Sequence, residues 1–94
     1  MIGVLTIHLN LPGCRSLKEK RSQIKPLLAR LQREFNISVA EMGLQDKWFE
    51  SIIACAMIGN DSAHLQRSLE TILKWIQANW RDGQVYDDGI EIIH

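Results

Sequence analysis

The sequence predicts an α+β fold in which two helices pack on one face of a four-stranded antiparallel sheet. Residues 2–11 alternate with a period of two, and residues 37–43 and 49–59 are rich in β-branched and small apolar residues. In two other segments apolar residues recur with the period of an α-helix. With a last strand over residues 85–93, six segments follow in the order strand, helix, strand, strand, helix, strand, and polar or glycine-containing links separate them. The chain has 94 residues, which is about the size of one domain. We therefore expect a single domain over residues 1–94.

The first strand is expected over residues 2–11, because the side chains of one parity are all aliphatic there. This apolar face consists of Leu5, Ile7, Leu9 and Leu11. The opposite face is mixed and consists of Val4, Thr6, His8 and Asn10. One purely apolar face predicts burial against a helix layer, and Pro12 with Gly13 ends the strand.

The first helix is expected to begin after Ser16, which has the side chain of an N-cap residue. Glu19 lies three residues later and completes a capping box. One apolar stripe runs to the end of the helix near Glu34: Leu17, Ile24, Leu28, Leu31 and Phe35. Pro26 lies inside this helix and removes one backbone hydrogen bond, so we expect a kink there rather than a break.

Two further strands are expected over residues 37–43 and 49–59, and the short polar link 44–48 predicts an antiparallel hairpin. The second helix follows Asn60, Asp61 and Ser62, all of which are good N-cap residues. Gly83 is expected to end this helix as a C′ glycine. The last strand spans residues 85–93, with an interruption expected near Asp88 and Gly89.

This order of elements is that of the ferredoxin-like βαββαβ fold. Right-handed crossovers then give the strand order 4-1-3-2, with both helices on one face. In this arrangement the first helix begins near the end of the second strand. Glu41 lies there and shares the parity of Ile37 and Val39, so its side chain is expected to point toward the helix layer.

Composition sets limits on function. The 11 Lys and Arg balance the 11 Asp and Glu, so no overall charge favours nucleic acid or an anionic membrane. Cys14 and Cys55 form no disulfide or metal-ligand pattern. No signal segment and no apolar run of membrane-spanning length is present, so we expect a cytoplasmic protein without a membrane partner.

Positive charge is concentrated at the start of the first helix. Between Arg15 and Lys25 five cations accompany one acid, and Lys18, Arg21 and Lys25 form a row on one flank. Cations at this position oppose the helix dipole, so helix stability alone does not favour them. Clustered cations at a helix N-terminus are typical of an anion or phosphate site, although a charged helix face is also compatible with a solvated surface.

The cluster divides into two roles. We expect Arg21 to turn inward and form a structural pair with Glu41. The remaining cations are the candidates for binding an anion or RNA: Arg15, Lys18, Lys20 and Lys25. Trp48, in the link between the middle strands, is a possible exposed anchor for a partner.

Other kinds of site find less support. Cys14 precedes the basic helix start, where a thiolate would be stabilised, but no resolving cysteine or general base is near in sequence. His8, His64 and His94 lack the spacing of metal ligands, and we expect no metal and no cofactor. The expected open face of the sheet lacks the stacking aromatics of an RNA-recognition sheet. Its aliphatic side chains instead favour self-association, for example as a homodimer through the sheet or across an edge strand, or burial by another chain.

Two segments resemble a known family. They are Ser16–Arg21, leading into the helix, and Arg33–Glu41 with Asp46–Trp48. Together they resemble the YlxP-like bacterial family, a domain of unknown function, over essentially the whole chain. The resemblance implies a ferredoxin-like fold in a cytoplasmic bacterial protein. It also implies an association with RNA or the ribosome, because members are often encoded beside genes for translation initiation and ribosome maturation.

The leading hypothesis is therefore a non-enzymatic binding module that contacts RNA or a ribosome-associated partner through the basic start of the first helix. One alternative is a homo-oligomeric scaffold that uses the face or edge of the sheet. Another is a phosphate-handling enzyme of the acylphosphatase type, which shares the fold and size. The link Leu11–Ser16 disfavours that enzyme, because it has one glycine and does not resemble the glycine-rich phosphate loop.

Overall fold

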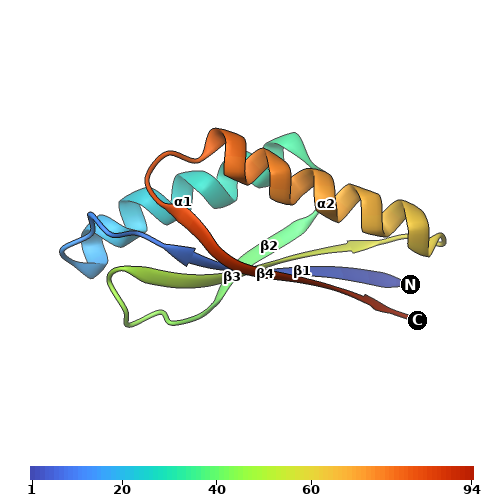
Figure 1. Cartoon of the computed structure of the whole chain (residues 1–94), viewed down its shortest axis with the longest axis horizontal. Helices are drawn as coiled ribbons and strands as arrows, with labels where there is room; N and C mark the ends of the chain where they lie inside the picture. The colour runs from blue at the N-terminus through green and yellow to red at the C-terminus, as the bar shows by residue number, and fades with distance from the viewer.

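The computed structural model describes residues 1–94 and contains the six predicted elements in the predicted order (Figure 1). The strands are β1 (Ile2–Asn10), β2 (Ser38–Gly43), β3 (Glu50–Ile58) and β4 (Gln84–Ile93). The helices are α1 (Leu17–Glu34) and α2 (Ser62–Asn79). Neither helix is long and apolar enough to cross a membrane.

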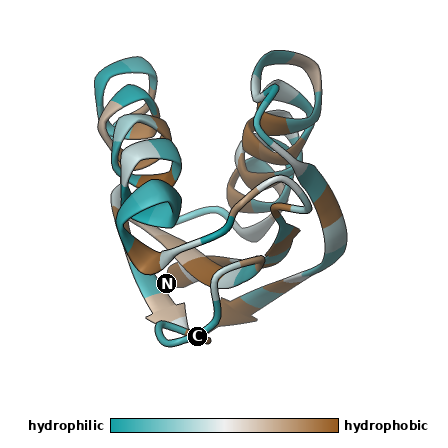
Figure 2. Cartoon of the chain, turned by 90° about the vertical axis from the view of Figure 1, so that its left-hand side faces the viewer, coloured by the Kyte–Doolittle hydropathy of each residue, from teal (hydrophilic) through white to brown (hydrophobic).

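The four strands form one antiparallel sheet in the order β2-β3-β1-β4, which is the predicted order read from the other edge. Figure 2 shows both helices above the same face of the sheet, while the other face carries no helix. The ferredoxin-like α+β prediction is thus confirmed. The sheet has a covered face and an open face, and these two faces carry different kinds of side chain.

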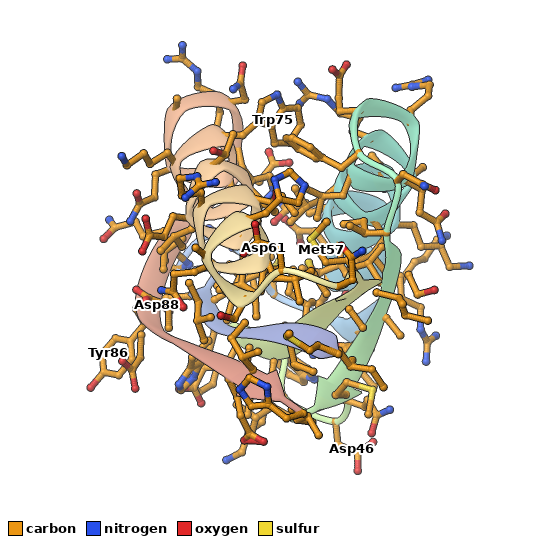
Figure 3. The ribbon with its side chains drawn as sticks, turned by 90° about the vertical axis from the view of Figure 1, so that its right-hand side faces the viewer. Asp46, Met57, Asp61, Trp75, Tyr86 and Asp88 are labelled. Carbon is orange, nitrogen blue, oxygen red and sulfur yellow. The ribbon has the colours of Figure 1, made fainter.

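The core lies between the helices and the covered face. The predicted apolar face of β1 is completely buried. It packs with buried aliphatic side chains of the helices and of β3: Ile24, Leu27, Leu31, Ile53, Leu69, Ile72 and Ile76. Trp80, which follows α2, is also part of this core. Trp75 lies between the helices (Figure 3), where its ring meets Phe35 edge-on and Arg30 lies 4.9 Å from the ring centre.

Two expectations about the last third of the chain are wrong in detail. Gly83 is not a left-handed C′ residue, since no glycine has positive φ and Trp80 caps α2. A Cβ atom at Gly83 would clash with the carbonyl oxygen of Asn10, so glycine is needed for close approach to β1. The irregularity of β4 also lies earlier than expected. His8 pairs with Asp87 and Leu9 with Val85, which makes Tyr86 the bulged residue.

Helix α1 continues through Pro26 without a break. Its N-terminus and the link between β2 and β3 lie at the same end of the molecule, opposite the two chain termini (Figure 1). That end contains most of the residues singled out by the sequence.

Candidate nucleic-acid interface

The start of α1 is fixed by Ser16 as the predicted N-cap residue and by Glu19, whose carboxylate binds the amide before the N-cap rather than the Ser16 amide of a capping box. The Ser16 hydroxyl accepts a hydrogen bond from the Glu19 amide (3.1 Å), and the Glu19 carboxylate accepts one from the Arg15 amide (3.2 Å). Both interactions stabilise the first turn by satisfying amides without intrahelical partners. The only acidic side chain between Arg15 and Lys25 is therefore engaged in capping.

Lys20 occupies the inward position that the sequence reading assigned to Arg21. Its side chain is 2% exposed, and its ammonium lies 2.9 Å from Glu41 Oε2 and donates to the Leu44 carbonyl at 2.7 Å. The Ser51 hydroxyl donates to the same Glu41 oxygen at 2.6 Å. Arg21 forms no ion pair with Glu41, so the predicted Arg21–Glu41 pair is wrong, and Lys20 is not available to an external anion.

The geometry of α1 explains why Lys20, and not Arg21, points inward. The residues of α1 that are buried are Lys20, Ile24, Leu27 and Leu31, a spacing of four, three and four residues that keeps one side of the helix inward. Lys20 begins this row, and Arg21 is rotated by about 100° from it. The inward orientation of Glu41 is as predicted, since its partner comes from α1.

Four of the five clustered cations are exposed: Arg15, Lys18, Arg21 and Lys25. We call Lys18, Arg21 and Lys25 the cation row. Arg21 and Lys25 border a cavity of about 210 Å³, where Ile24 and Leu28 of α1 face Glu41 of β2. Arg21 and Lys25 of the cation row therefore border a hollow between helix α1 and the edge strand β2.

The β2–β3 link adds exposed aromatic side chains at the same end. The Leu44 carbonyl accepts hydrogen bonds from the Lys47 amide (3.0 Å) and from Lys20, which fixes the turn against α1. Leu44 has φ 59°, a conformation that is unfavourable for a residue with a side chain. Trp48 and Phe49 follow the turn and are 50% and 48% exposed. The exposure of Trp48 agrees with the sequence reading, whereas the exposure of Phe49 was not predicted.

Cys14 does not have the environment of a reactive thiolate. Its side chain is buried, and the thiol donates to Gln23 Oε1 at 3.1 Å. Burial raises the pKa of the Cys14 thiol, and the Glu19 and Asp82 carboxylates raise it further, against a smaller opposite effect of Lys20. The expectation that the basic helix start would stabilise a Cys14 thiolate is therefore wrong.

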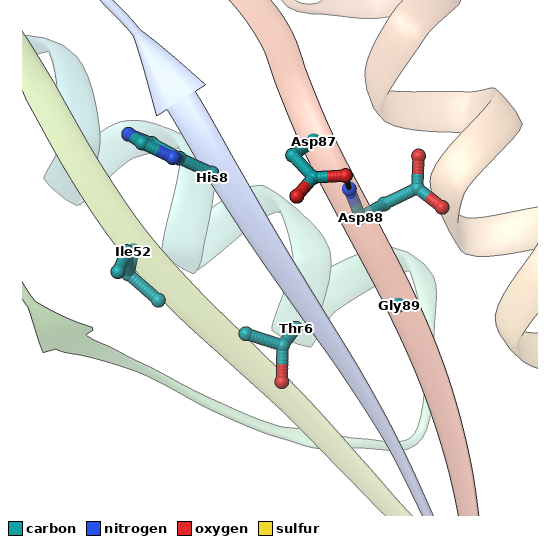
Figure 4. A pocket seen from close by; sticks show the side chains of 6 residues that line it. All are labelled: Thr6, His8, Ile52, Asp87, Asp88 and Gly89. Carbon is teal, nitrogen blue, oxygen red and sulfur yellow. Dashed lines mark hydrogen bonds between the residues drawn. The ribbon is translucent and has the colours of Figure 1, made fainter.

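A second polar feature lies on the open face of the sheet. His8 Nε2 is 3.1 Å from Glu50 Oε1, and the His8 ring meets Tyr86 edge-on at 5.0 Å. A shallow cavity of about 310 Å³ lies beside it, lined by Thr6, His8, Ile52 and Asp87 among others (Figure 4). No group of three or more His, Cys, Asp or Glu side chains is placed to hold a metal ion. The sequence reading missed this cluster, because strand pairing alone brings its members together.

Comparison with known proteins places this arrangement in a family. The model of a family described as "Protein of unknown function (DUF503)" matches residues 2–87. The chain belongs to the DUF503 family. It is also similar to the uncharacterized protein YlxP of Bacillus subtilis (strain 168), with 32% identity over 78 residues, covering 83% of this chain and 85% of YlxP. The resemblance to a YlxP-like family is thereby confirmed, and the matched residues include the cation row and the β2–β3 link.

Proposed function

We propose that this DUF503 member is a non-enzymatic module that binds RNA, within the ribosome or the translation apparatus, through the cation row and the β2–β3 link. The observation that carries the proposal is the position of Lys20. Its buried contacts with Glu41 and Leu44 hold the link against α1. Exposed cations and the exposed ring of Trp48 are thus fixed at one end of the molecule, as a phosphate-contacting and base-stacking surface requires.

Electrostatics supports the same proposal. The cation row lies in the first half of α1, where the helix dipole disfavours positive charge. None of its members appears in an ion pair, and the neighbouring Glu19 is engaged in the cap. Their positive charge is therefore free to contact phosphate groups. Three phosphate contacts to single-stranded RNA, one for each member of the cation row, give an expected slope of about −2 in a plot of log affinity against log salt.

The test is a salt titration of RNA affinity with a matched control. A fluorescent single-stranded RNA is titrated with the wild type, with Lys18→Ala/Lys25→Ala and with Arg67→Ala/Lys74→Ala. The two double variants remove the same charge at the same seven-residue spacing, from exposed positions on α1 and α2. We expect the α1 variant to lose about tenfold in affinity at low salt and to reduce the slope by about 1.4, while the α2 variant stays near wild type. Equal behaviour of the two variants, or no binding by the wild type, would refute the proposal.

Trp48→Ala separates stacking from phosphate contact. Loss of a stacked base lowers affinity by about five- to tenfold without changing the salt slope. The ribosomal part of the proposal has its own test, which is co-sedimentation of the protein with ribosomal subunits in a sucrose gradient. We expect the wild type in the subunit fractions and Lys18→Ala/Lys25→Ala at the top of the gradient. A wild type that stays at the top contradicts ribosome association while leaving the RNA titration unaffected.

A further inference from the structure

Aliphatic side chains are exposed on the open face of the sheet. Ile58 is 83% exposed, and Ile2 and Ile93 lie beside it on β1 and β4. Val4, Ala54 and Ala56 continue this apolar surface toward the middle of the sheet. A contiguous apolar patch of this kind is typical of a protein–protein contact. No Lys or Arg lies in any strand, and the open face carries three carboxylates: Glu50, Asp87 and Glu91.

We infer that a second copy of this chain covers the open face, in a two-fold dimer with its axis parallel to the strands and between β1 and β3. This axis places β1 of one copy over β3 of the other at the same level. The pairing register across the sheet then fixes which residues meet. Val4 and Ala56 are paired in the sheet, as are Thr6 and Ala54, so each larger side chain faces an alanine of the second copy.

Charge complementarity selects this axis. Asn10 and Glu50 are paired in the sheet, so each Glu50 faces an amide side chain of the second copy. The same axis places β4 of one copy over β2 of the other. Glu91 then faces Ser38, because both residues lie in the row that contains Val4 and Ala56. No carboxylate then faces another carboxylate.

Two other aligned arrangements are less favourable. An axis perpendicular to the strands through the row of Thr6 and Ala54 places Asp87 of one copy over Glu91 of the other, because these residues lie two positions on either side of that row. An axis along β1 places Asp87 over Ile52, and Glu91 over Ala56. The first brings like charges together. The second places two carboxylates against apolar side chains without partners, whereas the chosen axis places only Asp87 in such a position, over Gly43.

The size of the face is sufficient. The strands β1, β3 and β4 are about 30 Å long, β2 is about 20 Å long, and neighbouring strands are about 4.8 Å apart, which gives a footprint of roughly 500 Å² per copy. The two footprints together reach the roughly 1,000 Å² that a specific interface needs. Aligned sheets cross at about 30°, so contacts are closest on β1 and β3.

Both copies keep their α1 helices outward, and both cation rows lie at the same end of the dimer. The dimer does not depend on the proposed RNA function, but it would give RNA two contact sites.

The experiment is sedimentation velocity at chain concentrations from about 1 to 200 μM, since dimer formation depends on mass action. We expect the wild type at twice the 10.8 kDa of one chain in the upper part of this range. Ala54→Glu introduces a carboxylate at the centre of the face and should weaken the dimer about a hundredfold or more. Ala78→Glu makes the same change on the exposed side of α2 and should leave the dimer intact. Far-UV circular dichroism checks that both variants are folded.

Ser38 tests the axis without disturbing the centre of the sheet. Ser38→Lys should tighten the dimer about two- to fivefold by facing Glu91 of the second copy, and Ser38→Asp should weaken it by a similar factor. A wild type that remains monomeric, a folded Ala54→Glu that still dimerises, or assemblies larger than two chains overturn the proposal. Equal effects of the two Ser38 variants overturn the axis. Ala54→Glu lies away from α1, so its affinity for RNA at one site should equal that of the wild type. Measuring this affinity beside the dimer therefore distinguishes failure of the dimer from failure of the proposed function.

Discussion

Replacing Lys20 with methionine removes the buried ammonium and keeps most of the apolar side-chain volume. The Glu41 carboxylate then loses its charged partner, and the Leu44 carbonyl loses one of its two donors. Breaking a buried pair costs about 3–5 kcal/mol. The Glu41 side chain is 23% exposed and keeps the Ser51 hydrogen bond, so water and Ser51 offset part of this cost. We expect a loss of about 2–3 kcal/mol in the free energy of unfolding.

Urea denaturation followed by circular dichroism measures this loss, and for a chain of this size it corresponds to a fall of about 10–20 °C in melting temperature. Arg21→Met is the matched control, because Arg21 is exposed and has no ion-pair partner, and its cost should be below about 0.5 kcal/mol. In Lys20→Met/Glu41→Gln the uncompensated charge is also removed, so the double variant should lose less than the two single variants added together. Equal costs for Lys20→Met and Arg21→Met would refute the assignment of the pair to Lys20.

Two further predictions concern packing and pH. Gly83→Ala should lower the free energy of unfolding, measured by urea denaturation, by about 2–3 kcal/mol, because the added methyl group meets the Asn10 carbonyl. Gly13→Ala is the control, because nothing lies within 4 Å of a Cβ atom there. Equal costs for the two variants would contradict the steric reason. Burial raises the pKa of the Cys55 thiol from 9.0 to about 12. The folded state therefore keeps this thiol neutral while the unfolded chain ionises it, so the stability it contributes is complete below pH 9 and is lost as the pH rises toward about 12. Unfolding measured at about pH 8 and about pH 10.5 should show a smaller alkaline decline for Cys55→Ala than for the wild type, and identical declines would contradict the shift.

The order and pairing of the strands were predictable because their signals are local. Alternation in Leu5, Ile7, Leu9 and Leu11 defines a covered face, and the caps at Ser16 and at residues 60–62 define where helices begin. Once six elements are known, right-handed crossovers leave few topologies. The fold therefore follows from patterns that each span only a few residues.

The errors lie where the deciding contact is distant in sequence. The bulge at Tyr86 is set by pairing with His8 and Leu9, and Gly83 is set by the carbonyl of Asn10. Neither partner is visible in the sequence around the residue. In the candidate site, the exposure of Trp48 was predicted, but its placement near α1 depends on the Lys20–Leu44 hydrogen bond.

The choice between Lys20 and Arg21 was within reach of the sequence. A spacing of four, three and four residues links Lys20 to Ile24, Leu27 and Leu31, and the same rule applied to Arg21 gives Lys25 and Leu28. The sequence reading used a wider stripe that included Leu17 and Phe35. It therefore assigned the inward position at the start of the helix to Arg21, one residue after Lys20.

Charge segregation connects the two proposals. The chain has no net charge, yet all 11 Lys and Arg lie in helices or links, and the strands hold acids only. If RNA and a second copy bound the same face, binding of one would block binding of the other. Here the cation row lies on the helix layer and the aliphatic surface lies on the opposite face of the sheet (Figure 2). RNA affinity at a single site should therefore be the same for the dimer and for monomeric Ala54→Glu, and the dimer should gain only from joining two sites.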